Sequence, residues 1–369
     1  MCSSLEYNTQ AMKKSLTILA IESSCDETSA AVIRGGVVKS NIIASQALKL
    51  HAKYGGVVPE VAAREHVSAI IPTIELALTG AKIQKSDLDY IAVTKGPGLA
   101  TSLMVGIDTA KALGLALGIP VLPTNHLEGH IYANFVRKFQ ITNSKIQIFP
   151  ALILTVSGGH TLLVEMSRKA GSGSAGKKPH TFRIIGQTVD DAAGEAFDKV
   201  ARMLGLGYPG GLQLSLLARK GNPNKFKLPR PMINSGNFQF SFSGLKTAVL
   251  YTVQKIARSS KMLDKKTKAD LAASVQQAII DVLISKLDKA IQQYRPKTIM
   301  LGGGVAANEL LRSEFEKLAK KHKLKSSIPA LEYCTDNAAM IGLAAYYKIK
   351  SGKTRNQNFQ AEPNLGLHH

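Results

Sequence analysis

Cysteine is scarce in this sequence: Cys2, Cys25 and Cys334 are the only three among 369 residues, and no two of them form a CxxC pair. Thiols so few and so widely spaced exclude a disulfide framework and favour a reducing compartment. No apolar run approaches the roughly 20 residues that a membrane helix needs. The first fifteen residues also lack the apolar stretch of a signal peptide and the arginines of a transit peptide. We therefore expect a soluble, cytoplasmic protein without membrane association.

Acidic residues are outnumbered, since 47 lysines and arginines stand against 26 aspartates and glutamates and leave a net charge of +21. The excess gathers at residues 168–180, 220–230, 255–268 and 317–325. The first of these segments is also rich in glycine and serine, which is typical of a flexible surface loop. Charge at this level indicates a polyanionic partner, most simply a nucleic acid bound through its phosphates. Solubility in a lysine-rich proteome is the alternative that charge alone leaves open.

What the chain does contain is a repeated α/β pattern. An apolar run, a polar turn and a second β-like run occur twice, at 16–36 and at 151–167. A strand that enters a glycine-rich turn and then a helix also occurs twice, at 89–113 and 297–315. Glycines at the carboxyl ends of strands let backbone N–H groups approach a phosphate, and the helix that follows adds a favourable dipole. The repeats therefore predict two similar lobes with a nucleotide cleft between them.

This organisation is expected of the two-lobed actin-like ATPase and sugar-kinase (ASKHA) fold, an α/β fold. No Walker A pattern GxxxxGK[ST] competes with it. Apolar spacing predicts long helices at 101–117 and at about 267–294. The expected parts are an N-terminal extension (1–14), a first lobe (15–124), a second lobe (125–336) with a helical insertion at about 190–265, a helix (337–352) that completes the first lobe, and a tail (353–369).

The stretch HLEGH, residues 126–130, is the first candidate site. Asn125 is a good N-cap for a short helix, and Glu128 completes a capping-box-like pattern. At about 100° per residue, His126 and His130 lie about 40° apart around the helix and can share one metal ion, whereas Glu128 points away from it. A zinc peptidase instead places its glutamate directly after the first histidine. The spacing therefore argues against a zinc peptidase and leaves open a metal site of another kind or two ordinary histidines.

Two histidines need a third ligand. Asp336, within EYCTDNAAMIG, is the best candidate because it stands at a predicted junction between a loop and a helix. A carboxylate at such a junction can also cap the helix, and the sequence leaves both roles open. Cys25 and Cys334 lie near acidic residues but have no ligand spacing, so we expect both to be small buried residues.

Several ordered stretches carry a resemblance to a known family. They are IESSCDETSAAV (21–32), HAKYGGVVPEVAAREH (51–66), KGPGLATSLMVG (95–106), NHLEGH (125–130), VSGGHTLLV (156–164), VDDAAGEAFDKVARMLGLGYPGG (189–211), FSFSGLKT (240–247), GGGVAANELLR (302–312) and CTDNAAMIG (334–342). Through them the chain resembles the bacterial and organellar tRNA N6-adenosine threonylcarbamoyltransferases, once described as O-sialoglycoprotein endopeptidases. The tail departs from this resemblance, because it lacks the proline- and arginine-rich ending of bacterial members.

The resemblance implies a reaction and the residues that serve it. The reaction is transfer of a threonylcarbamoyl group from threonylcarbamoyl-AMP to N6 of the adenosine beside the anticodon, in tRNAs that read codons beginning with A. One divalent metal, iron or zinc, is implied at His126, His130 and Asp336, and ATP or AMP is a further ligand of the nucleotide site. The residues implied to contact the adenylate are Thr155, Val156, Ser157, Gly158, Gly159, Asp198, Gly211 and Asn308.

Three further residues are candidates for acid–base work. Asp26 and Glu27, in the first polar turn, are the carboxylates best placed to orient the amine or to accept its proton, and turn formation is their alternative role. His160, in SGGHT, is a weaker acid–base candidate.

The resemblance also implies partners. These are tRNA and two companion proteins, an inactive paralogue of the same fold and a small P-loop ATPase. Organellar relatives act as homodimers, so a second copy of the chain is the other expected partner. The residues alone leave other functions open: a metallopeptidase, an ATPase or sugar kinase of the same superfamily, and a scaffold paralogue, which would be expected to have lost the metal ligands.

Overall fold

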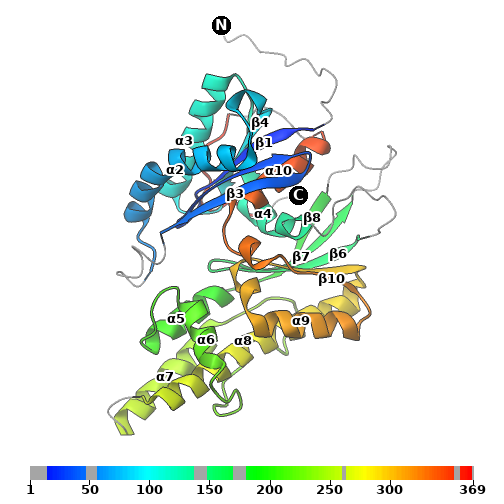
Figure 1. Cartoon of the computed structure of the whole chain (residues 1–369). Helices are drawn as coiled ribbons and strands as arrows, with labels where there is room; N and C mark the ends of the chain where they lie inside the picture. Colours follow the sequence, from blue (N-terminus) through cyan, green and yellow to red (C-terminus); the bar gives the residue numbers. More distant parts are fainter. Residues whose placement is uncertain are drawn as a thin grey trace.

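The computed structural model describes residues 15–46, 56–136, 148–168, 180–259, 263–352 and 358–367. These residues form two five-stranded sheets, one above the other in Figure 1, with helices between and around them. The predicted extension at 1–14 and nearly all of the basic segment at 168–180 lie outside the described residues.

The first sheet has the strand order β3-β2-β1-β4-β5. Its first three strands in the chain pair antiparallel, and β4 and β5 then extend the sheet in parallel on the other side of β1. The elements of this half are β1 (Thr17–Glu22), β2 (Glu27–Arg34), β3 (Val37–Ser45), α2 (Pro59–Ala81), β4 (Tyr90–Gly96), α3 (Ala100–Leu117), β5 (Val121–Asn125), α4 (His126–Tyr132) and, from the far end of the sequence, α10 (Ala338–Lys350).

The second sheet has the order β10-β9-β6-β7-β8. Here β6, β7 and β8 pair antiparallel, while β9 and β10 extend the sheet in parallel on the other side of β6. The elements of this half are β6 (Ala151–Val156), β7 (Thr161–Arg168), β8 (His180–Gln187), α5 (Ala193–Met203), α6 (Gly210–Ala218), α7 (Ser243–Ser259), α8 (Lys265–Tyr294), β9 (Thr298–Gly302), α9 (Glu309–Lys321) and β10 (Lys325–Ser327).

The two sheets therefore match in strand order and direction, with β1 to β5 of the first sheet corresponding in turn to β6 to β10 of the second. This confirms the duplication that the sequence predicted and gives the two-lobed actin-like α/β fold. The division of the chain into lobes at residue 124 and at residue 336 stays a prediction.

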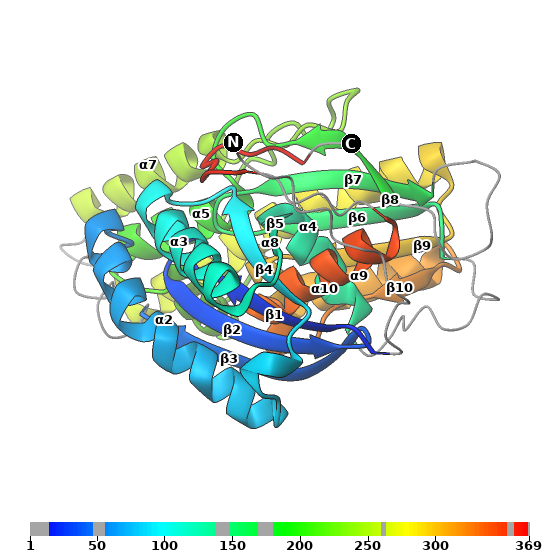
Figure 2. The same cartoon turned by 90° about the horizontal axis from the view of Figure 1, so that it is seen from above.

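The central strand of each sheet is buried on both faces, which is why both read as continuous apolar runs. In β1, Ile18 and Ala20 face the core between the sheets, while Leu19 and Ile21 face the core beneath α2 and α3. Figure 2 shows α2 and α3 on the outer side of the first sheet, with α10 on its other face. The alternation places α10 and α4 as a middle layer between the two sheets.

One described helix, α3, is long and apolar enough to span a membrane by length and composition alone, although no such run was expected from the sequence. In the structure α3 packs against β4 and α2. Leu103, Ile107 and Ala110 lie in the core, as their spacing predicted. The charged residues Asp108 and Lys111 stand within its otherwise mainly apolar sequence. We interpret α3 as a surface helix of the first sheet; localisation in the cytoplasm stays a prediction.

Part of the C-terminal tail, residues 358–367, lies against the loop that follows β4. The Glu362 N–H donates to the Lys95 carbonyl at 2.9 Å, and the Gly98 N–H donates to the Pro363 carbonyl at 3.1 Å. An ion pair between the Lys95 and Glu362 side chains, 2.5 Å from N to O, spans the same contact. The tail is thus held to the first sheet by backbone as well as side-chain interactions.

Gly96 is the residue that permits this contact. A Cβ added at Gly96 would lie 1.9 Å from the Glu362 carbonyl oxygen, a backbone atom that cannot rotate away. We therefore expect Gly96→Ala to displace the tail and to lower the free energy of unfolding by about 1–3 kcal/mol, the range typical of overpacking. Urea unfolding measures this. Gly236→Ala is the matched control, since a Cβ there meets nothing within 4 Å; equal stability of the two variants would refute the contact.

Candidate functional site

The short helix α4 begins at a firmly held cap. Asn125 Oδ1 accepts hydrogen bonds from the N–H groups of Leu127 and Glu128, at 2.8 and 3.4 Å. Its Nδ2 donates to the Gly366 carbonyl of the tail at 2.7 Å. The capping role predicted for Asn125 is confirmed, and the tail fixes the orientation of the capping amide.

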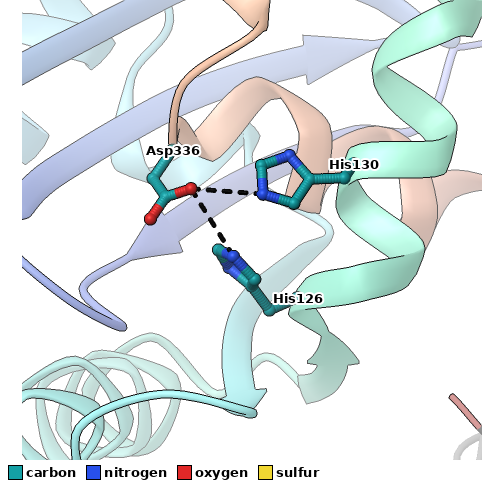
Figure 3. A group of neighbouring side chains, drawn as sticks. All are labelled: His126, His130 and Asp336. Atoms are coloured by element: carbon teal, nitrogen blue, oxygen red, sulfur yellow. Dashed lines mark ion pairs between the residues drawn. The ribbon is translucent and has the colours of Figure 1, made fainter. Parts of the chain in front are cut away.

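His126 and His130 project from the same side of α4, and Asp336 approaches them from the segment before α10 (Figure 3). His126 Nε2 lies 3.5 Å from Asp336 Oδ1, and His130 Nε2 lies 3.3 Å from the same oxygen. One candidate ligand atom from each residue lies within 4.8 Å of the others. Residues some two hundred positions apart thus meet at one point, as the sequence predicted for a shared ion.

The segment before α10 leaves Asp336 available for this contact. The N-cap of α10 is Asn337, whose Oδ1 accepts from the Met340 N–H at 3.0 Å. The alternative role of Asp336, capping the helix itself, is therefore wrong. Cys334 is fully buried, as expected, whereas Cys25 is only partly buried.

Gly129, the glycine inside HLEGH, brings the two helices together. A Cβ on Gly129 would lie 2.9 Å from Ile341 Cδ1 and 3.0 Å from Met340 Cγ, both on α10. Because α10 follows Asp336 directly, close packing of α4 on α10 sets the separation between the histidines and the carboxylate. The middle of the motif therefore serves packing, a role that its histidine spacing does not reveal.

A bulkier residue at position 129 should loosen this arrangement. We expect Gly129→Val to weaken zinc binding at least about tenfold, because α4 must move away from α10 while both histidines move with it. Isothermal titration with zinc measures the effect. Gly80→Val is the matched control, since Gly80 is also helical, is exposed, and its added Cβ would make only an ordinary contact at 3.7 Å. Unaltered zinc affinity in Gly129→Val would show that the helix contact does not set the site.

The chemistry of the three side chains fits a cation. His130 is fully buried, yet neither of its ring nitrogens has a hydrogen-bond partner among the described residues. Burial would raise the pKa of Asp336, but the charges of His126 and His130 hold it well below its usual range. Burial would lower the pKa of His126, but Asp336 and Glu22 raise it to about 9. The two carboxylates thus favour positive charge between them, which a divalent metal supplies.

Within the described part of the chain, His126, His130 and Asp336 are the one group of three or more such side chains that could hold a metal ion. Glu128 is not a member of it. The group therefore lacks the glutamate on which the peptidase hypothesis depends.

The turn between β6 and β7 lies near this group. Gly158 and Gly159 are exposed, and a Cβ on either would meet nothing within 4 Å. Thr155 is buried and its Oγ1 has no hydrogen-bond partner among the described residues. The Val156 side chain is part of the core, so only its backbone can contact a ligand. Ser157 Oγ accepts from the His160 N–H at 3.1 Å and closes the turn.

His160 lies close enough to the metal-ligand candidates to respond to their charge. Burial, together with the neighbouring His126 and His130, lowers the pKa of His160 to about 4. The neutral imidazole is therefore favoured at His160.

The turn between β1 and β2 carries Asp26 and Glu27. Asp26 is buried and lies 3.4 Å from the hydroxyl of Tyr208, which donates to its Oδ2 from the other half of the molecule. Burial and the charges of Asp26 and Asp336 raise the pKa of Glu27 well above its usual range. The neutral form is therefore favoured at Glu27.

Comparison with known proteins decides the family. The model of the family TsaD, tRNA N6-adenosine threonylcarbamoyltransferase, matches residues 37–343. The chain belongs to this family. The proteins of that name from Desulfitobacterium hafniense and Thermosipho africanus are 48% and 46% identical to it, and the alignments cover 96% and 95% of this chain and 98% and 100% of theirs. The family resemblance and the transferase class expected from the sequence are both confirmed.

Solved structures agree on the fold of this TsaD-family chain. Full-length HypF in a phosphate- and nucleotide-bound form aligns with a TM-score of 0.54 at 12% identity, over 90% of this chain and 46% of HypF. HypF from T. kodakarensis aligns with the same TM-score at 13% identity, over 92% of this chain and 48% of that one. At such identities the likeness concerns the fold alone.

Asp198 and Asn308, which the threonylcarbamoyltransferase resemblance implies as substrate contacts, both form hydrogen bonds within the protein. Asp198 Oδ1 accepts from the Gly211 N–H at 2.8 Å, at the start of α6. Asn308 caps α9 through the Leu311 N–H at 3.0 Å, and its Nδ2 donates to Ser215 Oγ at 2.9 Å. Their substrate roles stay predictions, since both side chains already stabilise helix starts.

Glu22 is a residue of this candidate site that sequence reasoning missed. It ends β1 and is fully buried, and its Oε2 lies 3.1 Å from His126 Nδ1. The one available signal was a carboxylate at the end of an otherwise apolar buried strand.

Proposed function

We propose that this chain transfers a threonylcarbamoyl group from threonylcarbamoyl-AMP to N6 of the adenosine beside the tRNA anticodon. The observation that carries the proposal is the convergence of His126, His130 and Asp336 in a chain of the TsaD family. The net charge of +21 suits a polyanionic substrate.

The three converging side chains would hold one divalent metal, iron or zinc, since two imidazoles and a carboxylate suit either. When bound, such an ion supplies Lewis acidity toward an acyl oxygen. The exposed turn at Gly158 and Gly159 would present backbone N–H groups to the phosphate of the adenylate, where no Cβ obstructs the approach. The buried, unpartnered Thr155 hydroxyl is a further polar group on that strand. The same site would accept AMP or ATP.

The reaction needs no fresh ATP cleavage at this step, because the adenylate is already a mixed anhydride. The N6 nitrogen forms a bond to the carbamoyl carbon, the bond from that carbon to the phosphate oxygen breaks, AMP leaves, and N6 gives up one proton. We assign acceptance of that proton, or orientation of the amine, to Asp26, which Tyr208 contacts from the opposite half. Because N6 is a poor nucleophile, positioning supplies much of the acceleration.

We also propose that the chain acts with companions: an inactive paralogue of the same fold, a small P-loop ATPase, or a second copy of itself. Large apolar side chains are exposed on both outer helices of the first sheet, namely Val67 and Ile71 on α2 and Met104 and Leu115 on α3. Light scattering of the chain alone and mixed with each companion tests this. A monomer under every condition, with full activity, would refute the proposal.

Label transfer tests the proposed reaction. Threonylcarbamoyl-AMP labelled in the carbamoyl carbon, unmodified tRNA, zinc or ferrous iron, and the companions should yield labelled tRNA and one AMP for each group transferred. A kinase or ATPase would instead consume ATP with a small acceptor, and a peptidase would cleave protein without tRNA. Unlabelled tRNA under every combination would overturn the transferase proposal.

A further inference from the structure

We propose that Glu22 is a positioning residue that holds a proton on His126 Nδ1 and thereby leaves His126 Nε2 as the atom that binds the metal. This inference rests on the metal role proposed for His126, and it does not depend on the transfer reaction.

The first observation is the burial of Glu22. It is the last residue of β1, none of its surface is exposed, and the other five residues of the strand are buried as well. An ionised carboxylate in such surroundings is costly unless it is paired and hydrogen-bonded. A glutamate at this position therefore has to be held by specific partners.

Those partners occupy both oxygens of the carboxylate. The Ser24 N–H donates to Oε1 at 2.6 Å, and the Thr94 hydroxyl donates to Oε2 at 2.7 Å. His126 Nδ1 lies 3.1 Å from Oε2. The first two partners lie on the turn after β1 and on the neighbouring strand β4, so the carboxylate is fixed by the sheet itself.

The third contact determines the state of the imidazole. A carboxylate can only accept, so the contact with Oε2 requires a proton on Nδ1. Ser24 Oγ, 3.1 Å from the same nitrogen, can accept as well as donate and is compatible with that proton. In the neutral ring, Nε2 is then the atom with the lone pair, and Nε2 is the nitrogen 3.5 Å from Asp336. Glu22 and Asp336 thus act on different nitrogens of one ring.

His130 provides the contrast. Neither of its ring nitrogens has a hydrogen-bond partner among the described residues. A buried carboxylate therefore holds one histidine of the pair in a set tautomer. For the other, the described residues show one polar contact, 3.3 Å between its Nε2 and Asp336 Oδ1. Removing an outer partner of a metal-bound histidine typically costs 10–100-fold in metal affinity. We assign that effect to Glu22 alone.

Glu22→Gln tests the assignment, because the amide has the same shape but no charge and can donate to Nδ1. Titration with zinc alone should show affinity reduced by about 10–100-fold. In zinc-loaded protein with ¹⁵N-labelled histidine, the wild type should show a protonated Nδ1 and a metal-bound Nε2 at His126. In Glu22→Gln, only a fraction of the molecules should show the protonated Nδ1 and the metal-bound Nε2 at His126.

Thr94→Val is the matched control. It removes one hydrogen bond to Glu22 but keeps the carboxylate beside His126, so zinc affinity should stay within about threefold of wild type, well short of the 10–100-fold expected for Glu22→Gln. Circular dichroism checks that each variant is folded. Should Glu22→Gln not fold, Glu22→Asp gives the same test, since it keeps the charge but withdraws it by one methylene.

The outcomes separate the two claims. Wild-type affinity and an unchanged nitrogen pattern in the folded glutamine or aspartate variant would overturn the role of Glu22 and leave the metal site standing. A wild-type protein that binds neither zinc nor ferrous iron would overturn the proposed metal role, and the inference about Glu22 with it.

Discussion

Replacing His126 with alanine should remove both the bound metal and the threonylcarbamoyl transfer. His126 supplies one of only two imidazoles in the group, and the buried His130 and the partly exposed Asp336 would then hold an ion with two ligands. We expect a loss of rate and of zinc affinity larger than the roughly 10–100-fold that the loss of an outer partner costs. Elemental analysis of protein purified without chelator, together with the label-transfer rate, measures both effects.

Glu128→Gln is the matched control for this substitution. Glu128 lies on the same short helix but is not a member of the metal-capable group. Metal content and transfer rate should therefore stay close to wild type, whereas a peptidase that used this glutamate would lose its activity. Transfer at the wild-type rate in His126→Ala would show that the reaction proceeds without the metal group.

The second large effect is expected at the first polar turn. Asp26→Asn should lower kcat by about 100-fold or more, since a positioned acid–base group typically contributes 10²–10⁴-fold. Zinc affinity should not change, because Asp26 is not one of the three candidate ligands. The single-turnover rate with saturating threonylcarbamoyl-AMP and tRNA measures the chemical step.

Glu27, next to Asp26 in the sequence, provides the comparison for the Asp26→Asn variant. The pKa of Glu27 is raised well above its usual range by burial and by the charges of Asp26 and Asp336, so its neutral form is favoured. Glu27→Gln imitates that form, and its rate should fall by less than about tenfold, below the range of a general base. If Glu27→Gln is the slower of the two variants, the roles assigned to these carboxyls are reversed.

Much of the candidate site could be predicted from the sequence because it follows from the geometry of residues close together in the chain. The spacing of His126 and His130 fixes their direction on any helix, and Asn125 is a capping residue wherever a helix follows it. The repeated run of strand, turn and strand likewise predicted the duplication, since each half carries its own complete pattern. Asp336 was the best candidate for the third ligand because of its place between a loop and a helix, and the family resemblance implied the same residue.

The features of the site that the sequence did not predict depend on contacts between distant parts of the chain. Glu22 sits in an apolar run, and only the folded sheet places Thr94 and His126 around its carboxylate. The packing role of Gly129 appears only once α10 lies against α4. Asp198 and Asn308 were expected at the substrate, and the structure shows each in a hydrogen bond at the start of a helix.

Nucleoside mass spectrometry of the product tRNA tests the proposed transfer directly. After incubation with threonylcarbamoyl-AMP, metal and companions, we expect one threonylcarbamoyl group per tRNA, on the adenosine beside the anticodon. We expect none on a tRNA with guanosine at that position, and none with the Asp336→Ala protein. Product tRNA without modified adenosine under all these conditions, or equal modification by the Asp336→Ala protein, would contradict transfer at this metal site.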